Sequence, residues 1–433
     1  MSGAIFALAV LALAAVAGAA WVRRDAQHRL VSSYGRDISM FRSGWVKLAL
    51  AVGVLAFISA PIGFSWIGFK GAHLPANLIP GLPLGDFPLS ILCIAGIFAI
   101  ASISLNLLIG YTGQVSLGQA AFMGVGAYVA GYFGSRRNPD NPSVAYFHIG
   151  GWYPPSWLWL LVALLAGAII SAAIGPLALR LRGQYLAVVS IGILFLAEHV
   201  FRNFESWTNG PIGRNQLPGV NVTIWPGKVL DFSTRESGDT DFFGFLYGRN
   251  QGYFWLIWGV VAVAAVVAKN LVRTRQGRAM MAVRDRDLSA EVIGVDLAST
   301  KIWAFAISGA LASLAGALYG SYIQALTPDS FSLNLSIQFV AIIIVGGVGT
   351  IFGSVIGAIA VSSLIELFNH YKWLFNWLPF LKTGLGEKGM NIENLVRVVY
   401  GLFIILFLMY FPFGLAGVWQ RIKRYLQTWP FSS

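Results

Sequence analysis

Residues 106–132 read NLLIGYTGQVSLGQAAFMGVGAYVAGY, and this stretch decides how the rest of the chain is interpreted. Glycines interrupt an otherwise apolar run, and polar side chains lie among them at Gln114, Ser116 and Gln119. Inside a bilayer, non-helical backbone is tolerated only where protein covers it or where it lines a water-filled cavity. Transporters use such breaks to direct helix ends at a solute. The stretch favours a broken helix on a translocation path, and the alternative is a short turn between close-packed helices.

The composition of the whole chain excludes a water-soluble globule. Of its 433 residues, 57% are hydrophobic and 11% are charged, against roughly 45–50% and about 25% in soluble domains. The 49 glycines and 15 tryptophans are typical of helices that pack closely in lipid and are anchored at its interface. The single cysteine, Cys93, excludes a disulfide framework and a cysteine-based metal site. We therefore predict an all-α, polytopic membrane protein.

Apolar runs long enough to cross a hydrocarbon core of about 30 Å occur about eleven times. Their orientation follows from Lys and Arg in short connections, which stay in the cytoplasm. The basic connection at 23–44 therefore places the N-terminus outside. Two spans within 335–369, meeting at glycines, are needed to keep the basic C-terminal residues inside. The predicted spans are 3–22, 45–69, 88–110, 113–133, 157–179, 184–204, 253–269, 301–325, 335–348, 350–369 and 395–413.

This pattern predicts three parts. Residues 1–44 form an N-terminal helix and a basic cytoplasmic connection. A cleaved signal peptide is the alternative for residues 1–22, although its positive charges would precede the apolar stretch and here they follow it. Residues 45–418 form the transmembrane domain, with an extracytoplasmic loop at 205–252 and a cytoplasmic loop at 270–300, and residues 419–433 form a cytoplasmic tail.

A second glycine-rich break lies late in the chain, at 346–350. Two interrupted segments, one in each half, indicate a central solute path. Glu198 lies in a predicted span, where a charge is costly and often marks such a path, but a position near the outer interface explains it equally well. The residues that we expect on the path are Asn106, Gln114, Ser116, Gln119, Phe122, Glu198, Gln338, Gly346 and Gly347.

The cytoplasmic stretch 277–293 is predicted to form one surface helix that ends at Gly294. Its apolar residues, at Ala279, Val283, Ala290 and Ile293, would form an exposed stripe. A short helix of this kind is suited to docking in a groove of a partner protein. The alternative is an ordinary basic loop that rests on lipid headgroups.

Catalytic patterns are missing from the sequence. The five histidines are scattered singly, which gives neither metal-ligand spacing nor a nucleophilic triad. A Walker-type phosphate loop and a dinucleotide-binding glycine motif are also missing. The chain is therefore predicted not to be an enzyme.

In order and spacing, these motifs resemble permease subunits of ATP-binding-cassette (ABC) importers for branched-chain amino acids, the LivM-type subfamily, whose relatives carry urea or short amides. The resemblance covers about residues 45–418. It rests on NLLIGYTGQVSLGQAAFMGVGAY at 106–128, ALRLRGQYLAVVSIG at 178–192, GPIG at 210–213, GRAMMAVRDRDLSAEVIGV at 277–295, IIIVGGVGTIFGSVIGA at 342–358 and FPFGLAG at 411–417.

The resemblance implies a ten-helix core, here with an extra N-terminal helix, in the bacterial inner membrane. It implies as partners a second, LivH-type permease, two ATPase subunits, an extracytoplasmic solute-binding protein and a small-molecule solute, but no nucleic acid. ATP and magnesium would be bound by the ATPases, and this chain would hold no cofactor. The loop at 270–300 would couple to the ATPases through Arg284, Asp285, Ala290, Glu291 and Gly294.

One departure from the resemblance bears on the solute. Many relatives carry Gly-x-Gly-Glu after the RGxYLA motif, whereas this chain has Phe195 in place of the Glu. If that carboxylate guides a zwitterion, a urea or short-amide importer becomes the alternative to an amino-acid importer. A second alternative is an ion-coupled carrier without ATPases, which the scarcity of membrane-embedded carboxylates disfavours.

Overall fold

The computed structural model describes residues 87–135, 154–180, 184–215 and 249–370. It also describes short pieces at 68–69, 72–73, 217, 219–225, 228–231, 241–242, 245–246, 381–382, 390–391, 401–402, 405, 407, 409–411 and 414–419. The predicted span at 3–22, most of 45–69 and 395–413, and nearly all of the predicted tail at 419–433 lie outside these residues.

The chain divides into two compact units. The larger comprises Ser90–Glu236 and Gly252–Val418, and the smaller comprises Met1–Leu89, Ser237–Gln251 and Trp419–Ser433. In the smaller unit, the described strands form two antiparallel pairs, β1 (Gly68–Phe69) with β2 (Ala72–His73) and β6 (Asp241–Phe242) with β7 (Phe245–Leu246).

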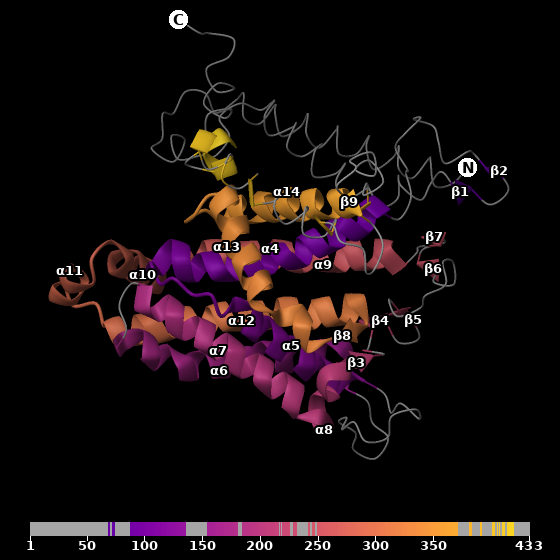
Figure 1. The fold of residues 1–433 in the computed structure, drawn as a ribbon, viewed down its shortest axis with the longest axis horizontal. Coiled ribbons are helices and arrows are strands. Elements are labelled where there is room, and N and C mark those ends of the chain that lie inside the picture. The colour runs from indigo at the N-terminus through magenta and orange to yellow at the C-terminus, as the bar shows by residue number, and fades with distance from the viewer. Residues whose placement is uncertain are drawn as a thin grey trace, which may run out of the picture. The chain divides into compact units, whose positions relative to one another are not determined.

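Long helices make up most of the larger unit (Figure 1). By length and apolar composition, six helical segments among the described residues can cross a membrane, which confirms the all-α, polytopic prediction. The long helices are α4 (Phe87–Thr112), α5 (Gln119–Gly134), α6 (Ser156–Arg180), α7 (Gln184–Asn203), α9 (Arg249–Arg273), α12 (Leu297–Ile323), α13 (Leu333–Gly346) and α14 (Ile351–His370).

Helix α12 packs against both α5 and α6. A Cβ atom at Gly126 of α5 would overlap the backbone of Ser313 in α12, and a Cβ at Gly316 of α12 would overlap the backbone of Met123 in α5. The two helices are therefore in reciprocal backbone contact, as small residues permit in membrane proteins. The Ser313 hydroxyl reinforces this contact by donating to the Phe122 carbonyl at 2.7 Å.

The break predicted within 335–369 is confirmed. Helix α13 ends at Gly346, α14 begins at Ile351, and the four residues between them form a turn. A Cβ at Gly346 would overlap the carbonyl of Gly353, so the two helices pack closely beside the turn. The predicted span at 113–133 differs from the structure, because α5 begins only at Gln119.

The cytoplasmic stretch differs from its prediction. Two helices, α10 (Arg275–Asp285) and α11 (Asp287–Val292), replace the single helix expected at 277–293, because Arg286 is extended, with φ −159° and ψ 113°. Val283 and Ala290, expected to be exposed, are buried. The termination at Gly294 is confirmed: α11 ends just before this glycine, whose φ is +87°.

Short elements close the opposite end of the larger unit from α10 and α11 (Figure 1). Helix α8 (Glu205–Thr208) and the turn η1 (Gly210–Ile212) follow α7. Strand β3 (Arg214–Asn215) pairs antiparallel with β8 (Ala325–Leu326), which ties this segment to the end of α12, and η2 (Pro328–Phe331) leads into α13. Two further described pairs are β4 (Asn221–Trp225) with β5 (Lys228–Asp231) and β9 (Leu381–Lys382) with β10 (Met390–Asn391).

Candidate functional site

The two glycine-rich breaks meet at Asn106, although they lie more than 200 residues apart in the sequence. Asn106 is fully buried in α4. Its Nδ2 donates to the Thr350 carbonyl at 2.9 Å and to the Ser354 hydroxyl at 2.7 Å. Its Oδ1 accepts from the Gly349 backbone N–H at 2.8 Å. Two of these bonds go to the turn between α13 and α14 and the third goes to the first turn of α14, so Asn106 holds this connection against α4.

The first break starts with a helix-ending motif that its sequence explains. Gly113 has φ +70°, which glycine adopts without a steric penalty. Its N–H donates to the Ile109 carbonyl, and the Gln114 N–H donates to the Leu108 carbonyl at 3.1 Å. The bond from Gly113 is that of the αL motif, and both bonds satisfy carbonyls at the end of α4. Helix α4 therefore ends here, and the chain runs non-helically to Gln119.

Gln119 fixes the start of α5 from inside the bundle. Its side chain is fully buried, and Nε2 donates to the Ser104 hydroxyl at 2.5 Å. Ser104 in turn donates to the Ser308 carbonyl of α12 at 2.6 Å. The Gln119 Oε1 has no hydrogen-bond partner among the described residues.

Gln114 is the most unusual polar side chain at the break. It is buried, and neither atom of its amide has a hydrogen-bond partner within the described part of the chain. Buried amides are normally paired with protein or water, and leaving one unpaired costs about 1–3 kcal/mol. The amide of Gln114 therefore has unused hydrogen-bonding capacity in a buried position.

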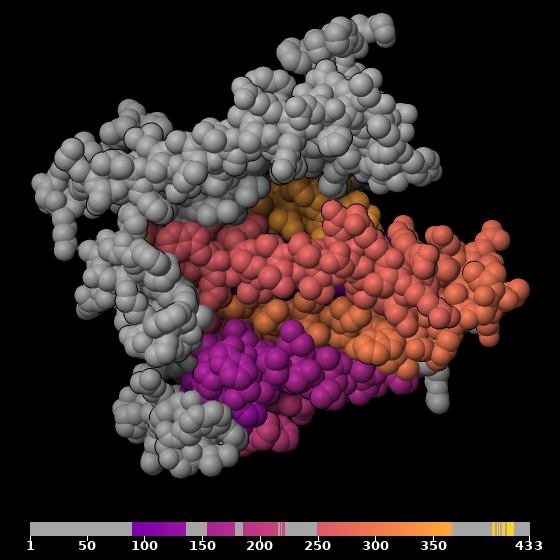
Figure 2. Space-filling view, turned by 180° about the vertical axis from the view of Figure 1, so that it is seen from behind, coloured from indigo at the N-terminus to yellow at the C-terminus, as the bar shows by residue number. Residues whose placement is uncertain are grey.

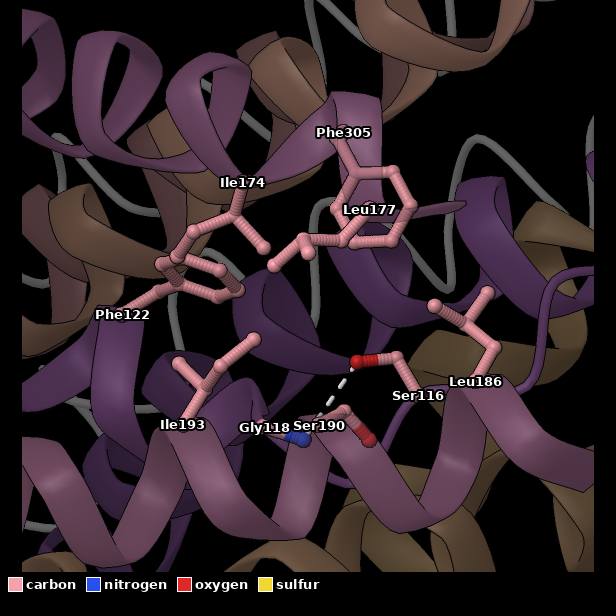
Figure 3. Close-up of a pocket in the computed structure, with 9 residues that line it drawn as sticks. All are labelled: Ser116, Gly118, Phe122, Ile174, Leu177, Leu186, Ser190, Ile193 and Phe305. Atoms are coloured by element: carbon pink, nitrogen blue, oxygen red, sulfur yellow. Dashed lines mark hydrogen bonds between the residues drawn. The ribbon is translucent and has the colours of Figure 1, made fainter. Parts of the chain in front are cut away.

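A small, mainly apolar cavity lies beside the first break, where α5, α6, α7 and α12 converge (Figure 3). Two of the residues expected on the path, Ser116 and Phe122, line it together. Ser190, which the sequence prediction missed, supplies a second hydroxyl, and this hydroxyl accepts from the Leu117 N–H at 2.7 Å. The full lining is Ser116, Gly118, Phe122, Ile174, Leu177, Leu186, Ser190, Ile193 and Phe305.

Glu198 and Gln338 lie away from this cluster. Glu198 is two helical turns beyond Ser190 along α7, and it accepts from Arg202 at 2.8 Å. Arg202 also pairs with Asp329 of η2 at 2.5 Å, so Glu198 belongs to an ion network at the end of α7. Gln338 is half-buried, two turns before the end of α13. Gly346 and Gly347, by contrast, lie at the second break, where Gly347 has φ +115°.

The residues expected to couple to ATPases divide into two groups. Arg284, Asp285, Glu291 and Gly294 are exposed, whereas Ala290 is buried. Arg284 makes a contact within the chain, because its Nη1 donates to the Gly110 carbonyl at 2.5 Å. The tip around α11 exposes Ile293, as predicted, and also Leu288 and Val292, which were not part of the predicted stripe. In Figure 2 this region, in coral and orange at the right, projects beyond the ends of the neighbouring helices.

A buried arginine lies near the opposite end of the larger unit. Arg214 of β3 donates from Nη1 to the Trp207 carbonyl at 2.8 Å. Burial lowers the pKa of its guanidinium to about 10, so the group remains charged at neutral pH. Among the described residues, no group of three His, Cys, Asp or Glu side chains could hold a metal ion.

Comparison with known proteins gives a consistent result. The family described as branched-chain amino acid transport system / permease component matches residues 87–408. The high-affinity branched-chain amino acid transport system permease protein LivM of Salmonella typhimurium is 31% identical over 287 residues, which cover 64% of this chain and 63% of that protein. No solved structure matches.

Two archaeal proteins of Methanocaldococcus jannaschii are similar over longer fractions of their own length. The probable branched-chain amino acid transport permease protein LivM is 22% identical over 349 residues, covering 74% of this chain and 90% of that protein. The probable LivH protein is 25% identical over 270 residues, covering 62% and 76%. The match to the bacterial LivM thus spans less than two thirds of that relative, while the archaeal matches span more.

Proposed function

This chain belongs to the permease-component family of branched-chain amino acid transport systems, and from that premise we propose that it is the permease subunit of an ATP-driven importer for branched-chain amino acids. The family match over residues 87–408 carries the proposal. The chain itself is a transport subunit, and ATP hydrolysis takes place on partner subunits that bind ATP and magnesium. Its place in this proposal is the bacterial inner membrane, as a multi-pass protein.

The exposed tip at α11 supports docking to an ATPase. Leu288, Val292 and Ile293 are 66%, 87% and 74% exposed, so large apolar side chains lie uncovered beside the charged residues of this segment. An apolar helix face of this kind fits a groove in a partner protein. In the proposed assembly this tip lies in the cytoplasm, and ATP binding moves it through the docked ATPase.

The solute path in this proposal runs past the first break. A branched-chain amino acid needs apolar surface for its side chain and hydrogen-bonding groups for its charged ends. The region around Ser116 and Phe122 offers the first, and the unpaired amide of Gln114 offers the second. Alternating access then follows because ATP and solute bind different states of the permease pair with different affinities.

Replacing Gln114 with leucine separates this role from a structural one. Because the Gln114 amide has no partner in the described structure, Gln114→Leu should leave the thermal midpoint in detergent unchanged or raise it. Solute uptake should nevertheless fall by about tenfold, the effect of losing one hydrogen bond to a charged group. Gln276→Leu, the same change at an exposed position of α10, is the matched control. Normal uptake by Gln114→Leu would assign Gln114 to helix packing.

Co-purification tests the proposed assembly. A tagged copy taken from its native membrane in mild detergent should bring down two ATPase subunits and a second, LivH-type permease, identified by mass spectrometry. Glu291→Arg and Gly294→Pro at the tip should abolish solute-stimulated ATP hydrolysis and preserve membrane insertion, since Glu291 is exposed and proline cannot adopt the φ of +87° found at Gly294. Recovery of the chain alone, or as a homo-oligomer, would contradict the proposal.

A further inference from the structure

We propose that Arg284 is a positioning residue inside this chain, which joins α10 to both helix breaks so that the tip and the breaks move as one body. The group formed by Arg284, Gly110, Gly349 and Asn106 is called the joint below. This inference rests on the proposed function, because movement of the tip has meaning only if an ATPase drives it.

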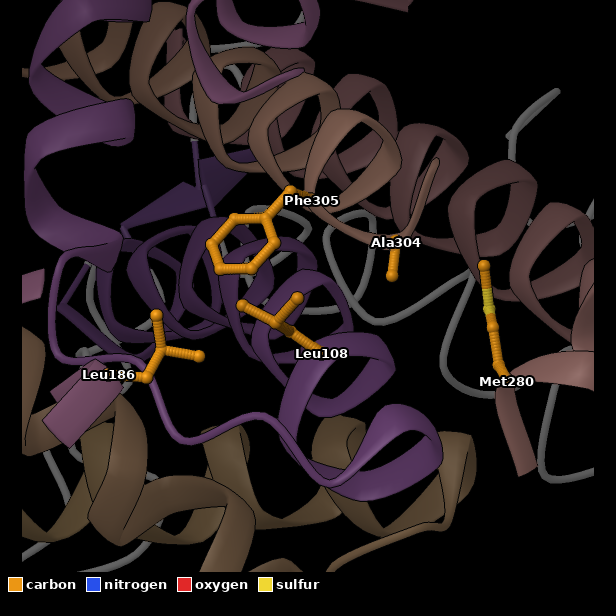
Figure 4. Close-up of a cluster of buried hydrophobic side chains, with 5 residues drawn as sticks. All are labelled: Leu108, Leu186, Met280, Ala304 and Phe305. Carbon is orange, nitrogen blue, oxygen red and sulfur yellow. The ribbon is translucent and has the colours of Figure 1, made fainter. Parts of the chain in front are cut away.

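Helix α10 is already fixed to the membrane-spanning helices by its apolar side. Met280 is 1% exposed and belongs to a buried cluster with Leu108 of α4, Leu186 of α7 and Phe305 of α12 (Figure 4). Val283 is 2% exposed. Because close-packed interiors transmit displacement, a movement of α10 must also move α4, α7 and α12, the helices against which it packs.

Arg284 adds a directed contact at the end of α10. Its Nη1 donates to the Gly110 carbonyl, which lies in the last turn of α4. Carbonyls in the last turn of a helix lack intrahelical partners and carry partial negative charge. A guanidinium there supplies a hydrogen-bond donor and also a favourable positive charge. Arg284 therefore contacts the last turn of α4, just before the first break begins at Gly113.

The second break completes the joint. A Cβ atom at Gly349 would lie 3.1 Å from Arg284 Nη1, and Gly349 has φ +80°. The Gly349 N–H is bonded to Asn106, only one turn before Gly110 in α4. A continuous set of contacts thus runs from α10 through the end of α4 to the turn between α13 and α14. Movement of α10 displaces both breaks together.

This role differs from a direct contact with an ATPase, which was expected for Arg284 from the sequence. If Arg284 acts through the joint, Arg284→Gln should still co-purify with ATPases, and solute transported per ATP hydrolysed should fall by about tenfold or more, as for losing a charge-assisted hydrogen bond. In Arg284→Lys, which keeps a charged donor, the solute transported per ATP hydrolysed should fall by less. Arg278→Gln, at an exposed arginine of the same helix, is the matched control and should behave as wild type.

A cysteine cross-link gives the sharpest test. A Cβ built at Gly113 would lie 3.6 Å from the Cβ of Arg284, within the roughly 3.5–4.5 Å that a disulfide spans. The double variant Gly113→Cys with Arg284→Cys is made in a Cys93→Ala background, which removes the only native cysteine. The reduced complex should transport poorly, and oxidation should restore transport, because the disulfide replaces the lost contact with a covalent one.

The outcomes separate the two proposals. If the wild-type complex shows no ATP-dependent uptake, the proposed function is wrong. Wild-type uptake, combined with normal transport by Arg284→Gln or with no recovery in the cross-linked protein, would overturn the joint alone. A thermal midpoint in detergent checks that the double variant folds; if the cysteine at Gly113 unfolds the protein, the comparison of Arg284→Gln with Arg284→Lys and Arg278→Gln decides.

Discussion

Replacing Asn106 with leucine is expected to lower the free energy of unfolding by about 3 kcal/mol or more, at about 1–3 kcal/mol for each buried polar group left unpaired. The side chain is fully buried and makes three hydrogen bonds, two to the turn between α13 and α14 and one to Ser354 in the first turn of α14. Leucine has a similar size but makes none of these bonds, so the Gly349 N–H and the Thr350 carbonyl lose a partner. Thermal unfolding in detergent measures the effect.

Two further variants locate the cause. Ser354→Ala removes one partner of Asn106 and keeps the other two, so it should lower the free energy of unfolding by only about 1 kcal/mol. Asn106→Asp keeps an acceptor for Gly349 but sets a carboxylate oxygen against the Thr350 carbonyl, so it should be nearly as damaging as leucine. A wild-type midpoint for Asn106→Leu would show that the two breaks do not depend on this residue.

Gly126→Leu is expected to be the second severe change, because no side chain fits between α5 and α12 at this point. A Cβ at Gly126 would overlap the backbone of Ser313, and backbone can be displaced only by separating the helices. Overpacking of a close-packed interior usually costs about 1–3 kcal/mol and more where backbone must move. We expect little folded protein to be recovered from membranes, as measured by monodisperse yield in detergent.

Two other glycines provide the matched control for Gly126. Gly192 in α7 and Gly259 in α9 are also helical, but a Cβ there would meet none of the described residues within 4 Å. Leucine at either position should be tolerated and should gain up to about 1 kcal/mol of helix propensity. Equal losses of yield in all three variants would refute close packing as the cause.

The positions of most spans could be predicted from the sequence, because apolar length alone identifies them. Helices α6, α7 and α12 begin and end within a few residues of their predicted limits. The start of α5 could not be predicted in the same way. It depends on Gln119 reaching Ser104 in another helix, and hydropathy contains no information about such a tertiary contact.

The cytoplasmic loop shows a different limit. A helical period identifies an apolar stripe but not what the stripe faces, and Val283 and Ala290 face the interior of this chain. Leu288 and Val292, which are exposed, did not belong to the predicted stripe. The break at Arg286 rotates α11 relative to α10, and a single continuous period cannot describe two helices.

The candidate site was predictable only as separate pieces. Each glycine-rich break was visible in the sequence, as were Asn106 and Arg284 as individual residues. Their meeting was not, because Asn106 and Gly349 are 243 residues apart and are joined only by the fold. Glu198 illustrates the converse: a carboxylate in an apolar run suggested a path, and the structure pairs it with Arg202 in an ion network that includes Asp329.

The most direct test of the proposed function is uptake of radiolabelled leucine by proteoliposomes that contain the complex purified through this chain, together with its solute-binding protein. We predict uptake that requires ATP hydrolysis and is competed by unlabelled isoleucine and valine but not by urea or acetamide. Competition by urea or acetamide alone would replace the amino-acid solute with a neutral amide, and uptake driven by an ion gradient without ATP would contradict the assignment as an ATP-driven importer.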